Sequence, residues 1–253
     1  MRMKLLAGAC AVAVCGLWFG QAAADPTATL GGGYSYTDIN GASGHLNDWG
    51  VNGSVAAPIA SNWTVQADGA YDNFTGQGGG SAHTDAISGT AFWSGAKGRL
   101  GATAGYNQIG AGGTTASFEN YGGFGVLYAT DHLTFGLKGG AITGSGLHTG
   151  YAGAEVIGYV TPDAALSGTI DYTTLGGTHF TAYGVHGEYL VSHTMPISVT
   201  AGFTRTELGA FAQTNTYSVG LKYYFGGKGS LVEHQRSGDE TWGSKQTAVS
   251  VLF

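Results

Sequence analysis

Twelve stretches of the sequence, each about ten residues long, alternate apolar side chains with small or polar ones. In the last stretch every second position is apolar or aromatic, and most of the residues between are small or polar; these positions are Tyr217, Val219, Leu221, Tyr223 and Phe225. Successive side chains of a β-strand point to opposite faces, so the pattern predicts strands with one apolar and one polar face. The predicted strands span residues 28–39, 45–57, 63–74, 85–93, 100–109, 117–129, 133–143, 151–160, 165–174, 180–190, 197–208 and 214–225.

So many two-faced strands in succession indicate a wall between lipid and water. After residue 24 no apolar run approaches the 18 or so residues that a membrane helix requires. A chain without such helices crosses a membrane only as a closed sheet, because every backbone group must then find a partner. With 47 glycines and only 10% charged residues, the composition fits such a wall. The predicted fold class is therefore all-β, a transmembrane antiparallel up-and-down β-barrel of about twelve strands.

An even strand count places both ends of the barrel in the periplasm. The outer loops are then short, at most ten residues, and cover residues 40–44, 75–84, 110–116, 144–150, 175–179 and 209–213. Aromatic residues gather at the two ends of the predicted apolar faces, as in the girdles at membrane interfaces. One girdle comprises Trp63, Trp93, Tyr128, Tyr189, Tyr223 and Phe225, and the other comprises Trp49, Tyr71, Tyr106, Tyr172 and Tyr183.

Residues 1–24 have the pattern of a secretory signal peptide. Arg2 and Lys4 precede an apolar run over residues 5–20, and the small residues 22–24 end it. A membrane anchor is the weaker interpretation, because the run is short. We therefore expect the exported chain to begin at Asp25.

The cysteine count and the charge exclude several classes of site. Cys10 and Cys15 both lie within the predicted signal peptide, so residues 25–253 contain no cysteine and form neither disulfides nor thiolate metal sites. The net charge of −6 becomes −8 once Arg2 and Lys4 are removed. An acidic chain of this kind is not expected to bind nucleic acid.

Residues 218–225 match the terminal assembly signal of outer-membrane barrels: polar, any, Gly, any, any, hydrophobic, any, aromatic. Ser218, Gly220, Tyr223 and Phe225 occupy its defining positions. The chain thus resembles Gram-negative outer-membrane β-barrel proteins of the small porin-like type, and its Gly226–Leu231 segment is similar to a short tail in alphaproteobacterial porin-like proteins. The resemblance implies location in the cell outer membrane, contact with its lipid and lipopolysaccharide, and assembly by the barrel-insertion machinery.

The chain departs from that resemblance because it continues to Phe253. Residues 246–253 nearly match the assembly signal a second time, with Ala248 where glycine is expected. Two organisations follow. In the preferred one, residues 25–226 form the barrel and residues 227–253 form a periplasmic tail; in the other, residues 245–253 add the closing strand.

The predicted lumen is acidic. Its acids are Asp48, Asp68, Asp72, Glu119, Glu155, Asp171 and Glu188, opposed by Lys138, Lys222 and His186. An acidic ring in a narrow passage favours cations. The preferred function is a narrow porin-like passive channel for small cations or solutes, and the alternative is a non-conducting structural or ligand-holding barrel.

Enzymatic function is not expected. The sequence lacks the G-x-S-x-G motif of a nucleophile elbow and the spacing of common metal sites, so no catalytic residue, metal or cofactor is assigned. His83, His148 and His179 are placed in three separate predicted loops. An outer-membrane hydrolase and a secreted all-β adhesin remain remote alternatives.

Overall fold

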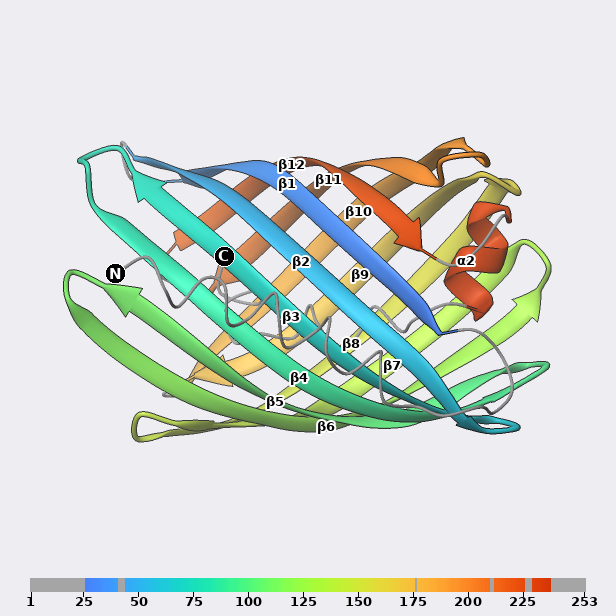
Figure 1. The fold of residues 1–253 in the computed structure, drawn as a ribbon. Helices are drawn as coiled ribbons and strands as arrows, with labels where there is room; N and C mark the ends of the chain where they lie inside the picture. The colour runs from blue at the N-terminus through green and yellow to red at the C-terminus, as the bar shows by residue number, and fades with distance from the viewer. Residues whose placement is uncertain (1–25, 41–43, 176, 210–211, 226–228, 238–253) are drawn as a thin grey trace.

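Twelve antiparallel strands form one closed barrel in the computed structural model, and consecutive strands are neighbours in the sheet (Figure 1). The structure describes residues 26–40, 44–175, 177–209, 212–225 and 229–237. The strands are β1 (Thr27–Asn40), β2 (His45–Ala60), β3 (Trp63–Gly76), β4 (Ser81–Gly95), β5 (Gly98–Ala111), β6 (Thr114–Thr130), β7 (Leu133–Gly144), β8 (Leu147–Thr161), β9 (Ala164–Leu175), β10 (Thr178–Ser192), β11 (Ile197–Leu208) and β12 (Ala212–Phe225). The predicted fold class and strand number are confirmed.

The first and last strands close the ring. Ala28 of β1 lies opposite Phe225 of β12, and the pairing continues without a shift to Asn40 and Gln213. Both strands therefore have hydrogen-bonded neighbours on each side, which leaves no sheet edge. The alternative closing strand at residues 245–253 lies outside the described residues, as does the predicted signal peptide.

The strands extend farther into the connections than the sequence predicts. Pairing between β5 and β6 continues to Ala111 and Thr114, so the loop predicted at residues 110–116 is a two-residue turn. Gly112 and Gly113 both have positive φ, 57° and 84°, which is the backbone of a type I′ hairpin turn. The β7–β8 connection is equally tight, and its Ser145 has a φ of 49°.

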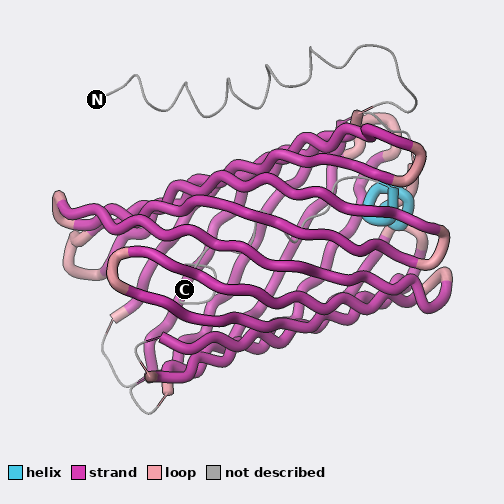
Figure 2. Tube along the Cα trace, turned by 90° about the horizontal axis from the view of Figure 1, so that it is seen from below, coloured by secondary structure: helices cyan, strands magenta, loops and turns pink. Residues whose placement is uncertain are grey.

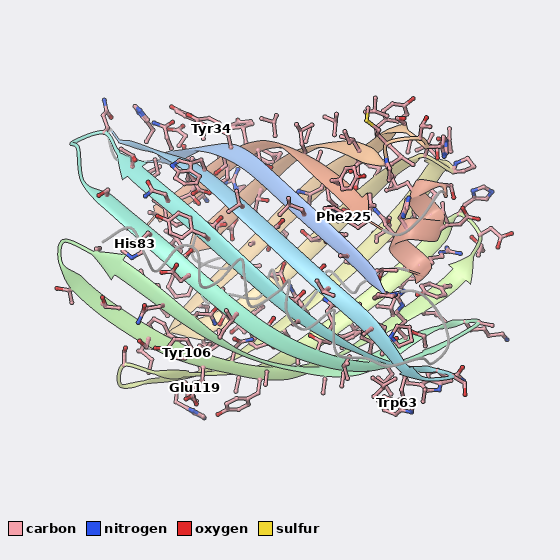
Figure 3. The ribbon with its side chains drawn as sticks, viewed as in Figure 1. Tyr34, Trp63, His83, Tyr106, Glu119 and Phe225 are labelled. Carbon is pink, nitrogen blue, oxygen red and sulfur yellow. The ribbon has the colours of Figure 1, made fainter. Side chains whose placement is uncertain are left out.

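The outer face of the barrel is apolar and bounded by aromatic residues at both ends. Trp63 and Phe225 lie toward one end, where β1 begins and β12 ends, whereas Tyr34 and Tyr106 lie toward the other (Figure 3). Trp63 pairs across the sheet with Trp93, and both rings are exposed. We call these the terminal end and the hairpin end of the barrel.

The predicted face of β6 is wrong. Phe118, Asn120 and Phe124 point inward and are buried, whereas Tyr121 and Leu127 are exposed on the outer face. Shifting the face assignment of a strand by one residue reverses every side chain. Two predicted positions change as a result. Glu119 faces outward (Figure 3). Tyr128 does not belong to the girdle with Trp63 and Trp93 but points into the barrel.

One helix, α2 (Leu231–Ser237), follows the last strand and lies at the terminal end, inside the ring of strands (Figures 1 and 2). Leu231 is fully buried and packs with residues of β8, β9, β10 and β12, namely Tyr159, Ala165, Leu190 and Tyr224. A second cluster inside the barrel joins Phe118, Ile142 and Tyr151. Within the described ranges, no helix is long and apolar enough to cross a membrane.

Candidate functional site

The candidate site is the lumen, because the inner faces of most strands are polar and line it, although β6 also places Phe118 and Phe124 there. Buried polar side chains bond across neighbouring strands: the Thr90 hydroxyl donates to Thr103 at 3.1 Å, and the Asn107 amide donates to Asn120 at 2.8 Å. Buried polar groups need such partners, so these contacts stabilise the wall from inside. The lumen thus combines a fixed polar lining with charged groups.

Inward glycines make room for polar side chains of the neighbouring strand. A Cβ at Gly50 would collide with the Asp72 carboxylate, and one at Gly31 would collide with the Asn52 amide. The space beside these glycines is therefore partly filled by side chains lying along the wall. These side chains make the passage narrower than the number of inward glycines alone would suggest.

Three predicted lumen acids lie on the inner faces of β2 and β3. Asp68 is buried and accepts hydrogen bonds from Gln66 Nε2 at 2.6 Å and Ser88 Oγ at 3.1 Å. The Asp72 carboxylate accepts one from Thr84 Oγ1 at 3.2 Å, and the Asp48 carboxylate one from Ser35 Oγ at 3.4 Å. In the described part of the chain, neither Asp48 nor Asp72 forms an ion pair.

A lysine and an aspartate face each other on the opposite wall. Lys138 Nζ on β7 lies 2.6 Å from Asp171 Oδ1 on β9, and both side chains are mostly buried. Gly153 of the intervening β8 lies between them, because a Cβ there would collide with both side chains. Glu155 also lies on the inner face of β8. Asp171 therefore contributes little net charge to the lumen.

Glu188 is the centre of a hydrogen-bond network near the terminal end. Its carboxylate accepts from Lys222 Nζ at 3.0 Å, the Tyr224 hydroxyl at 2.6 Å and Ser198 Oγ at 2.5 Å. Gln235 of α2 donates to the same carboxylate at 3.2 Å. The predicted lumen residues Glu188 and Lys222 are thus brought together, and they neutralise each other.

Two arginines at the terminal end were missed by the sequence analysis. Arg99, which precedes the strand predicted at residues 100–109, is the second residue of β5 and is 4% exposed, and Arg236 enters the lumen from α2. The one feature of the sequence that could have indicated the position of Arg99 is that it immediately precedes the alternating stretch at residues 100–109. Since Glu119 faces outward, the described lumen holds six carboxylates and four lysine or arginine side chains. The carboxylates belong to Asp48, Asp68, Asp72, Glu155, Asp171 and Glu188, and the cations to Arg99, Lys138, Lys222 and Arg236.

Histidines on the outer surface do not form a catalytic or metal cluster. His83 stacks on Tyr71 with ring centroids 6.3 Å apart, and Nδ1 of His179 lies 2.5 Å from the Tyr172 hydroxyl. These residues and the exposed His148 lie on three different hairpins. No three histidine, cysteine, aspartate or glutamate side chains of the described residues are grouped to hold a metal ion.

Comparisons with known proteins identify the fold. No protein-family model matches the chain, and no curated protein does. Solved structures do match. An outer-membrane channel from Pseudomonas putida F1 has a TM-score of 0.57 at 14% identity, over 80% of this chain and 96% of the other.

The translocator domain of the autotransporter NalP from Neisseria meningitidis has a TM-score of 0.52 at 16% identity, covering 87% of this chain and 93% of that domain. The KdgM porin has a TM-score of 0.52 at 10% identity, covering 78% and 99%. At these identities the likeness concerns architecture. The chain has the fold of outer-membrane β-barrel channels and translocator domains.

Proposed function

We propose that the protein is a narrow passive channel of the Gram-negative outer membrane. The observation that carries the proposal is the closed ring of twelve strands, apolar outside and lined inside by hydrogen-bonded polar and charged groups. Eight strands leave room only for side chains, and the bore grows with strand number. The solved structures of similar architecture include an outer-membrane channel and a porin, which supports the proposal.

The aromatic bands support the location in the outer membrane, with lipid and lipopolysaccharide as surroundings. Tyr71 lies eight residues beyond Trp63 on β3, which corresponds to roughly 20 Å along the axis of a tilted strand, close to the height of a lipid band. The terminal end then faces the periplasm and the hairpin end faces outward. The fully described turns at the hairpin end, residues 77–80, 112–113 and 145–146, are two to four residues long.

We further propose that the channel prefers cations. Lys138 and Lys222 are paired with Asp171 and Glu188, so neither lysine offsets the carboxylates on β2 and β3. Asp48 and Asp72 therefore give one wall of the lumen a negative field. Fixed charges in a narrow passage concentrate the oppositely charged ions.

Planar-bilayer recording under a salt gradient tests both parts of the proposal. The wild type should conduct and show a cation-selective reversal potential. Asp48→Asn with Asp72→Asn should move the reversal potential toward zero, since these carboxylates face the passage. Asp171 is not chosen for this test, because its carboxylate is already paired with Lys138 and its neutralisation would also change the surroundings of that cation.

The matched control is Asp85→Asn with Glu119→Gln, which removes two carboxylates from the outer face. Salt at 0.15 M screens charges beyond about 8 Å, so this control should leave the reversal potential unchanged. An anion-selective wild type, or an equal change in the control, would contradict the cation preference. Absence of conductance in every variant, including those designed below, would contradict the channel.

A further inference from the structure

The helix α2 is too short to be stable alone, so its place in the barrel depends on contacts with the wall. Ser230 and Glu233 form a capping box: the Ser230 backbone N–H donates to the Glu233 carboxylate at 2.8 Å, and the Glu233 N–H donates to Ser230 Oγ at 3.3 Å. Isolated helices shorter than about 12 residues are marginal in water. The capping box starts the helix, and tertiary contacts must hold it.

Apolar and aromatic contacts fix the first turn of α2. Leu231 is fully buried among Tyr159, Ala165, Leu190 and Tyr224. The His234 ring stacks on the Tyr224 ring, with centroids 4.5 Å apart and planes 13° from parallel. These contacts join the helix to the inner faces of β8, β9, β10 and β12.

Arg236 fixes the last turn to the inner faces of β6, β7 and β8. Its guanidinium donates to the Thr130 carbonyl at 2.6 Å and to Thr134 Oγ1 at 3.1 Å, and it lies over the rings of Tyr128 and Tyr159, 4.9 and 5.2 Å from their centroids. Both rings belong to the inner wall. Charge-assisted hydrogen bonds of this kind are about twice as strong as neutral ones.

The backbone of Arg236 is held as well. Arg99 Nη2 donates to its carbonyl at 2.6 Å, and the Tyr128 hydroxyl donates to the same oxygen at 3.2 Å. A cation at a helix C-terminus is favourable because the last carbonyls carry partial negative charge. Arg99, which the sequence pattern did not place in the lumen, thus binds the C-terminal end of α2.

The contacts of α2 come from β5, β6, β7, β8, β9, β10 and β12, so the helix lies against more than half of the ring of strands at this mouth. Both views place it within the ring at the terminal end (Figures 1 and 2). A helix with its side chains is roughly 10 Å across, a large part of the bore of a barrel of this size. We propose that α2 is an intramolecular plug that restricts passage through the terminal mouth.

This inference rests on the proposed channel and adds its regulation. Most of the contacts that hold the last turn are polar and are made by one residue, Arg236, so loss of this side chain would loosen the last turn. The hydrogen bond from Gln235 to the Glu188 carboxylate links the plug to the charged lining. Release of α2 would break this bond.

Single-channel recording of the full chain tests the plug. Arg236→Ala and Leu231→Asp should each raise the conductance or the time spent in a larger conductance state, and deletion of residues 229–253 should raise the conductance about twofold or more, since a helix leaves the bore. The matched control is Arg205→Ala, which removes an arginine exposed on β11 and should change nothing. Deletion of residues 238–253, which retains α2, should also leave the conductance near that of the wild type.

Cysteine cross-linking provides a readout that does not depend on the effect of a deletion. Residues 25–253 contain no cysteine, so Leu231→Cys with Leu190→Cys introduces one thiol pair within the buried cluster. Joining the two thiols with a short bifunctional reagent should hold the conductance low, and a cleavable linker should restore the uncross-linked level.

The outcomes separate the two proposals. Equal conductance in the wild type, the Arg236 and Leu231 variants and the 229–253 deletion would overturn the plug and leave the channel intact. A full opening produced by deletion of residues 238–253 alone would also overturn it, because α2 would remain. No conductance in any form, although the protein is assembled in membranes, would overturn the channel itself.

Discussion

At the scale of single residues, the wall divides each strand into a side that meets lipid and a side that meets the lumen. Leu221 of β12 is 59% exposed on the outer face, whereas Ser218 points inward. Leu221→Arg should lower the free energy of unfolding by about 2–4 kcal/mol, the cost of arginine near the bilayer midplane.

Denaturant titration of the barrel in phospholipid vesicles measures this loss. Ser218→Lys is the control, and it should cost less because the inner face is polar. Equal losses at the two positions would show that β12 does not separate lipid from lumen.

The faces of most strands could be predicted at this scale, and β6 shows when they could not. Phe118 and Phe124 point inward while Tyr121 points outward, so both faces carry aromatic residues. Gly122, Gly123 and Gly125 have no side chain to indicate a face. The alternation therefore did not favour either face, and the single acidic or basic residue of β6, Glu119, was wrongly assigned to the lumen.

At the scale of elements, the turns decide where pairing ends. Gly113 has a φ of 84°, which L side chains rarely adopt, and Gly112 before it is also left-handed. Gly113→Ala should therefore lower the free energy of unfolding by about 1–2 kcal/mol. The matched control is Gly89→Ala in β4, where the added Cβ meets no atom within 4 Å. Unfolding titrations of the two variants should differ by this amount, and equal stability would argue against the type I′ turn.

The existence of the strands follows from alternation, but their ends and α2 do not. Predicted loops such as residues 110–116 are rich in glycine and threonine, which sequence patterns associate with loops, although tight turns allow pairing to continue through them. The α2 segment has seven residues, too few for a helical period to be recognised. Its conformation depends on contacts with Arg99, Tyr159 and Tyr224, which are distant in sequence. Only the folded barrel brings these residues next to α2.

At the scale of the whole molecule, closure requires that the last strand find the first, and β12 is the strand that contains the proposed assembly signal. Phe225 lies opposite Ala28 at the terminal end, and its exposed ring makes an edge contact with Tyr223 at 4.5 Å between centroids. Deletion of residues 230–253 removes α2 and none of this pairing. The barrel-insertion machinery should therefore require Phe225 and tolerate the deletion.

Phe225→Ala should sharply reduce the amount of barrel in the outer-membrane fraction, measured as the heat-modifiable band on a gel. Phe203→Ala is the matched control, because Phe203 is an outward aromatic residue on β11 that contacts Tyr217 and lies outside residues 218–225. It loses the same outward ring and should assemble at nearly the wild-type level. If the deletion abolished assembly while Phe225→Ala did not, the signal would lie in residues 246–253 instead, and the role of β12 would be limited to pairing with β1.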